Sequence, residues 1–223
     1  MLPVINHYAL LNNVVLLEKT SALAVEFVHY ATTATTPLAG HSQRQICQIG
    51  LASTGYSIFF SILPLLKAGY LVSAAVLLRA FIERTATIAW LSSGDDKDLQ
   101  IYLNEWNNPK KRPGIKSRLR CLENYIGNRE ALAHLNFKIS DHLIDDWLDT
   151  LNGYVHGDQA QADNHAIHDP HESTFACGPD PNHPDTCNRL ASLAVTLMGQ
   201  FHHEIKRSLP YLMGGEQNQP GNR

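Results

Sequence analysis

The sequence has few charges, few cysteines and no pattern that is typical of a secretory leader. Charged residues make up 17% of its 223 residues, and the formal net charge is −3, which excludes a global basic field for nucleic acid. The four cysteines are irregularly spaced, which is more typical of a reducing compartment than of a disulfide framework. Residues 1–33 contain neither a basic n-region nor a small-residue cleavage site. We therefore expect a cytoplasmic protein.

Apolar residues at helical spacing are the main pattern in the sequence, which shows no strand pattern and no nucleotide-binding glycine motif. The pattern predicts helices over residues 2–34, 42–66, 70–91, 95–106, 115–126, 140–156 and 185–212. The first helix has its apolar face at Leu10, Val14, Leu17, Ser21, Val25 and Val28, and the last at Leu190, Leu193, Leu197, Phe201 and Ile205. We expect an all-α antiparallel bundle in one domain over residues 1–213, with a long irregular loop at 157–184 and a flexible tail at 214–223.

One uncharged stretch, residues 45–66, is long enough to span a bilayer. Several glutamine, serine and threonine residues interrupt it, and Pro64 lies near its end. A central helix of a soluble bundle has the same composition. We interpret the stretch as such a helix and expect no membrane association.

The helix at residues 70–91 is apolar almost all round, so its charged residues need an explanation. Arg79 and Glu83 lie one helical turn apart, and buried charges are costly unless they are paired. We expect both side chains to be mostly buried and paired with each other, so that Glu83→Ala would cost about 3–5 kcal/mol. The pair is either a structural ion pair or a guanidinium held at a pocket for phosphate or another anion.

The helix at residues 140–156 carries a polar stripe that contains Asn152 and His156. His156 is the last residue before Gly157, so it lies where the helix dipole favours a protonated imidazole. It is either a capping residue or a general acid and base with Asn152 beside it.

A loop rich in histidine and cysteine precedes the last helix. Its candidate zinc ligands are His165, His168, His171, Cys177, His183 and Cys187. Their spacing matches no compact zinc pattern, so a histidine-rich surface loop is the preferred interpretation. We predict no metal site and no cofactor.

The segment from residue 109 to residue 120 is basic and has no acidic residue. Its cations are Lys110, Lys111, Arg112, Lys116, Arg118 and Arg120. Such local density can bind phosphates in a salt-dependent way. It can equally form a solvated face opposite the acidic helix at 141–149, and both interpretations stay open.

The segments YLVSAAVLLRAFIERTATIAWL (residues 70–91) and LNGYVHGD (residues 151–158) together resemble a set of bacterial helical proteins related to the HEPN superfamily. The resemblance covers roughly residues 45–160 and implies an α-helical, often dimeric bundle. Many HEPN members are metal-independent ribonucleases of toxin–antitoxin or phage-defence systems. Their site uses an arginine, a polar residue and a histidine. Asn152 and His156 match the last two, whereas Leu151 occupies the arginine position, so the cation would have to come from Arg79.

Two functions follow from these observations. In the first, the protein acts on RNA through a catalytic set of Arg79, Glu83, Asn152 and His156, and the basic segment binds the nucleic acid. In the alternative, it is a non-catalytic, dimerising or partner-binding helical bundle. The expected partners are a second copy of the chain, RNA, or another protein.

Overall fold

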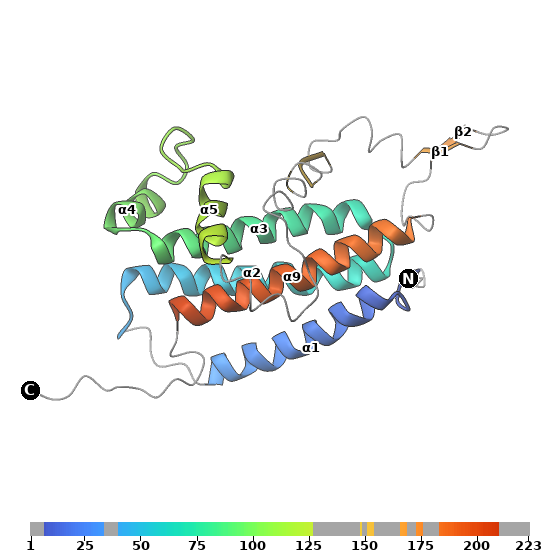
Figure 1. Cartoon of the computed structure of the whole chain (residues 1–223), viewed down its shortest axis with the longest axis horizontal. Helices are drawn as coiled ribbons and strands as arrows, with labels where there is room; N and C mark the ends of the chain where they lie inside the picture. The colour runs from blue at the N-terminus through green and yellow to red at the C-terminus, as the bar shows by residue number, and fades with distance from the viewer. Residues whose placement is uncertain are drawn as a thin grey trace, which may run out of the picture.

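The computed structural model describes residues 7–33, 40–126, 148, 151–153, 166–168, 173–175 and 183–209. Helices dominate these residues, which confirms the all-α class (Figure 1). The helices are α1 (Asn12–Thr33), α2 (Gln43–Lys67), α3 (Leu71–Ser93), α4 (Asp96–Asn104), α5 (Ile115–Ile126) and α9 (Pro184–Ser208). Residues 148 and 151–153 are also helical, within the predicted helix at 140–156. The predicted tail at 214–223 lies outside the described residues.

Helices α2 and α3 form an antiparallel pair at the centre of the bundle. The turn between them needs Gly69, whose φ of 82° is a left-handed conformation that other residues rarely adopt. Phe59 packs against Phe81 in the middle of the pair, and at the end away from the turn the Gln48 amide donates a 2.9 Å hydrogen bond to the Ser92 hydroxyl. Helix α9 packs on both helices, and α1 packs on α9 and α2 (Figure 1).

Helix α2 is long and apolar enough to cross a membrane by length and composition alone. In the structure it packs against α1, α3 and α9, and its inner face is buried at Phe59, Ile62 and Leu66. A core helix of a bundle passes the same composition test. The absence of membrane association stays a prediction.

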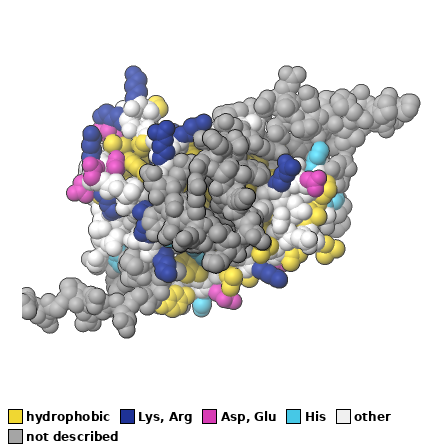
Figure 2. Space-filling model, in the orientation of Figure 1, with side chains coloured by type: hydrophobic (Ala, Val, Ile, Leu, Met, Phe, Trp, Pro, Cys, Tyr) yellow, Lys and Arg dark blue, Asp and Glu magenta, His cyan; other side chains and the backbone are white. Residues whose placement is uncertain are grey.

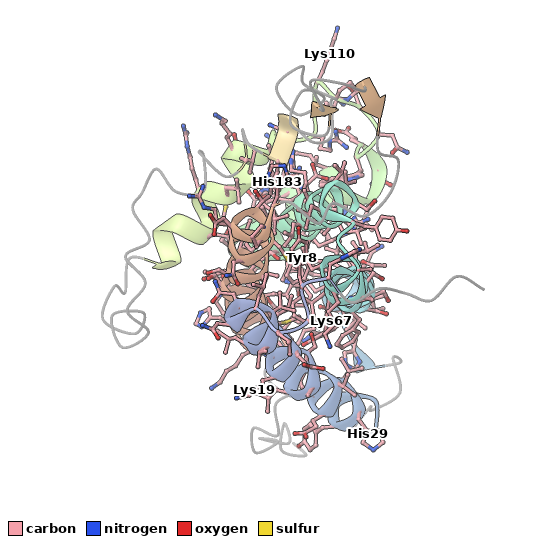
Figure 3. All side chains as sticks on the ribbon, turned by 90° about the vertical axis from the view of Figure 1, so that its right-hand side faces the viewer. Tyr8, Lys19, His29, Lys67, Lys110 and His183 are labelled. Atoms are coloured by element: carbon pink, nitrogen blue, oxygen red, sulfur yellow. The ribbon has the colours of Figure 1, made fainter. Side chains whose placement is uncertain are left out.

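The first predicted helix begins too early. Residues 7–11 form bends and turns, and α1 starts only at Asn12. Tyr8 holds this segment at the end of the bundle through two hydrogen bonds (Figure 3). Its N–H donates to the Lys67 carbonyl at 3.3 Å, and its hydroxyl accepts from the N–H of His183 at 3.1 Å. Leu10 is 92% exposed and Val25 is also exposed, so both were wrongly placed on the apolar face.

The predicted loop at residues 157–184 contains regular structure. Strands β1 (Ala166–His168) and β2 (Ser173–Phe175) pair in antiparallel register, with Ile167 opposite Thr174. Three-residue strands leave almost no alternation in the sequence, which is why the pattern predicted only an irregular loop. The hairpin does not change the fold class.

Gly55 of α2 provides a test of how closely α9 approaches this helix. A Cβ at Gly55 would lie inside van der Waals contact with the buried ring of Phe201, whereas a Cβ at Gly50 would meet nothing within 4 Å. We expect Gly55→Ala to lower the free energy of unfolding by about 1–3 kcal/mol, as overpacking does. The matched control Gly50→Ala should raise it by about 0.5–1 kcal/mol through helix propensity. Urea denaturation measures both values, and equal shifts would contradict the close approach.

Candidate functional site

Arg79 and Glu83 form the predicted pair. Arg79 Nη1 lies 2.9 Å from Glu83 Oε1. The Arg79 side chain is only 14% exposed, but that of Glu83 is 46% exposed, so the prediction that both are mostly buried is wrong for Glu83. Glu83 reaches solvent because it lies at the edge of the apolar face of α3. A half-exposed ion pair is worth about 1 kcal/mol or less, so the cost expected for Glu83→Ala falls well below that of a buried pair.

Arg79 also contacts the second predicted motif. Its Nε donates a 2.9 Å hydrogen bond to Asn152 Oδ1 across 73 residues of sequence. The guanidinium is therefore held on two sides, by a carboxylate from its own helix and by an amide oxygen from residues 151–153. The structure brings Arg79, Glu83 and Asn152 together. His156 lies outside the described residues.

Leu151, at the position where the resemblance would lead one to expect an arginine, is fully buried. It belongs to the same hydrophobic core as the apolar residues of α3 and α9. A charged side chain at this position would need a buried partner. This position therefore contributes to packing, and Arg79 is the guanidinium next to Asn152.

Arg118 is the main departure from the predicted basic surface. It belongs to the segment that was expected to bind nucleic acid, but it is only 3% exposed. Its Nη1 donates to Thr87 Oγ1 at 2.5 Å and lies 3.5 Å from the Glu83 carbonyl oxygen. The sequence contained the signal, because Arg118 falls in the apolar row of α5 with Ile115, Leu119 and Leu122.

The other cations of the segment lie at the surface. Lys110, Lys116 and Arg120 are exposed, and Lys110 extends away from the molecule in Figure 3. Lys111 Nζ forms a 2.7 Å ion pair with Glu105, and the two line a groove of about 380 Å³ with Lys97, Gln100 and Ile101. The guanidinium of Arg112 lies 5.4 Å from the centre of the Trp106 ring. Figure 2 shows basic side chains at the end of the molecule that carries α4 and α5.

Trp106 was not predicted as part of the site. Its ring stacks with Trp90 at 6.1 Å and meets Tyr102 edge-on at 4.9 Å. The guanidinium carbon of Arg118 lies 5.1 Å from the same ring, so two arginines make cation–π contacts with one tryptophan. Trp106 thus links the end of α3 and the helix α4 to the basic segment.

Three other arginines act electrostatically on Arg118. Burial, together with the charges of Arg112, Arg79 and Arg84, lowers the pKa of Arg118 to about 10. Glu83 opposes this shift, as the one acidic group that acts on Arg118 among the residues the structure describes. Arg84, like Trp106, was not among the predicted site residues.

The histidine- and cysteine-rich loop shows no metal-binding geometry where it is described. No group of three or more His, Cys, Asp or Glu side chains that could hold an ion occurs among the described residues. Cys187 is fully buried against the Leu66 carbonyl, and burial raises the pKa of its thiol to about 12. Zinc takes a thiolate, which this environment disfavours. His165, His171 and Cys177 lie outside the described residues.

Comparisons of the chain with family models, with curated proteins and with solved structures find no match.

Proposed function

We propose that this protein is a HEPN-like helical bundle that acts on RNA at a site built around Arg79, Asn152 and His156. The observation that carries the proposal is the 2.9 Å hydrogen bond between Arg79 and Asn152. This bond joins the two segments on which the resemblance rests. It also brings the Arg79 guanidinium next to Asn152, where Leu151 provides no cation. A bacterial toxin–antitoxin or phage-defence system is the proposed setting, with a homodimer as the proposed assembly.

The chemistry assigned to the site is metal-independent cleavage of a phosphodiester. His156 takes the proton of the ribose 2′-hydroxyl, the 2′-oxygen attacks phosphorus, and the 5′-oxygen leaves with a proton returned by the imidazole. Arg79 stabilises the negative charge that develops on the phosphate oxygens. Its Nε and Nη1 face Asn152 and Glu83, and Nη2 is the nitrogen left to contact phosphate.

A second candidate function is a non-catalytic bundle that dimerises or binds a protein partner. The burial of Leu151 favours this function, since a core residue occupies the position that corresponds to the HEPN arginine. In that case Arg79, Glu83 and Asn152 form a structural polar cluster that fixes how the helices pack.

Incubation with single-stranded RNA in the presence of a chelator separates the two functions. We expect the wild type to cleave. His156→Ala should lower the rate by about 10²-fold or more, as loss of a general acid and base does. Arg79→Met should lower it by about 10²-fold, the loss expected for a group that stabilises developing charge.

The control variant Arg189→Met removes an exposed cation of α9. It should cleave like the wild type, and thermal unfolding should show that all three variants are folded. A wild type without cleavage, or full cleavage by folded His156→Ala, would contradict the enzymatic proposal and favour the partner-binding bundle.

A further inference from the structure

Three arginines from three parts of the chain lie on or near α3. Arg84 lies on α3, Arg118 lies on α5, and Arg112 lies in the segment between α4 and α5. Arg112 and Arg118 both lie against the Trp106 ring, and the charges of Arg112, Arg84 and Arg79 all act on Arg118. We call Arg84, Arg112 and Arg118 the arginine cluster. It holds more positive charge than its described surroundings balance, because Glu83 is shared with Arg79.

The buried member of the cluster has an unused donor. Arg118 Nε is shielded from solvent and has no hydrogen-bond acceptor, although Nη1 of the same group binds Thr87. A buried N–H without an acceptor costs free energy, and more so when it belongs to a charged group. Such a donor in a folded protein calls for an acceptor, and an anion is one kind.

We propose that the arginine cluster binds a phosphate group. Arg118 provides the buried cation at the base of the site, and Arg112 and Arg84 provide the cations nearer to solvent. Guanidinium groups match the geometry of phosphate oxygens and bind them in a bidentate way. The Trp106 ring holds Arg112 and Arg118 in place through the two cation–π contacts.

The structure also indicates why the site prefers phosphate to a small monovalent ion. Guanidinium groups from separate elements offer donors in different directions, and a tetrahedral oxyanion can accept from more than one of them. One chloride neutralises a single charge and accepts no bidentate pair. The half-exposed carboxylate of Glu83 lies next to the site and can turn toward solvent when an anion enters.

The inference does not rest on the proposed function. It requires neither His156 nor cleavage, and its phosphate can belong to a small molecule or to a nucleic-acid backbone. If the RNA-acting proposal is correct, the cluster is an additional phosphate contact outside the Arg79–Asn152 pair. If that proposal fails, the cluster still binds phosphate.

The test is the thermal unfolding midpoint of the full chain at constant ionic strength, with phosphate exchanged against chloride. We expect phosphate to raise the midpoint of the wild type in a saturable way. Arg112→Met removes a solvent-exposed member without disturbing the core, and it should weaken phosphate binding about tenfold or more, as the loss of a charged bidentate contact does. Arg118→Met should abolish the shift, and the control Arg189→Met should keep it.

Further arms identify the source of the phosphate. Pyrophosphate and a single-stranded oligonucleotide are titrated into the cleavage-deficient His156→Ala variant, and competition by inorganic phosphate shows whether they share the site. Binding of phosphate that Arg112→Met and Arg118→Met weaken supports the proposal, whichever source binds more tightly. A wild-type midpoint that does not respond to phosphate, or an equal response in Arg112→Met, overturns it even if RNA cleavage is observed.

Discussion

Arg207→Met should lower the free energy of unfolding at pH 7 by about 3 kcal/mol, because it leaves a buried carboxylate without its cation. Glu204 of α9 has a side chain with no exposed surface, and Arg207 Nη2 lies 3.0 Å from its Oε2. The Gln200 amide donates to Oε1 at 3.3 Å, but a neutral amide does not replace the charge. Arg207 is partly exposed and also donates to the Ala89 carbonyl, so Glu204→Gln should cost less than Arg207→Met.

The loss caused by Arg207→Met should depend on pH in a defined direction. Burial raises the pKa of Glu204, and Arg207 opposes that shift. Without Arg207 the pKa of Glu204 rises further, so the folded state binds a proton at a pH where the unfolded chain does not. Between the two pKa values stability falls as pH rises. The variant should therefore regain stability as the pH is lowered through the folded-state pKa of Glu204.

Urea denaturation of wild type and variant over a pH series measures this effect. The double variant Glu204→Gln/Arg207→Met is the control, because it has no buried carboxylate and should lose the acid-dependent recovery. A difference between Arg207→Met and wild type that stays constant from pH 7 to pH 5 would mean that Glu204 is not the group left uncompensated.

Glu204 also shows where sequence reasoning reached its limit. The apolar row of the last helix was predicted correctly at Leu190, Phe201 and Ile205. Glu204 lies next to Ile205 in sequence and is buried beside Arg207, which also donates to the Ala89 carbonyl of α3. Helical periodicity identifies the buried face of a helix, but it does not locate the neighbouring backbone that lets a charge pair lie there.

The candidate site was predictable in its local part only. An Arg–Glu pair at i, i+4 follows from helix geometry, and the structure contains it. The contact between Arg79 and Asn152 spans 73 residues and depends on tertiary packing. From the sequence we could say only that a catalytic site would require Arg79 to lie near Asn152. Arg118 was placed on the surface because charge density was weighed above its position in an apolar row.

Phe201→Ala should lower the free energy of unfolding by about 3–5 kcal/mol, the range for an aromatic side chain removed from a core. Phe201 is fully buried where α9 meets α2 and α3, with its ring 4.9 Å from that of Phe81 and 5.1 Å from that of Tyr56. The exposed Leu23 of α1 is the control, and Leu23→Ala should change stability by about 0.5 kcal/mol or less.

The ring of Phe201 also decides the effect of a methyl group at Gly55. In the wild type Gly55→Ala overpacks the contact and destabilises the protein. In the Phe201→Ala background the ring is gone, so the added methyl partly fills the cavity and improves helix propensity, and Gly55→Ala should then stabilise by about 0.5–1 kcal/mol. Gly50→Ala should have the same effect in both backgrounds, because nothing lies near its Cβ. Phe201→Leu serves for the same cycle if Phe201→Ala does not fold. Additive effects of Gly55→Ala and the Phe201 variant would mean that α2 and α9 do not pack at Gly55, whereas a reversal of sign confined to Gly55 places Phe201 against it.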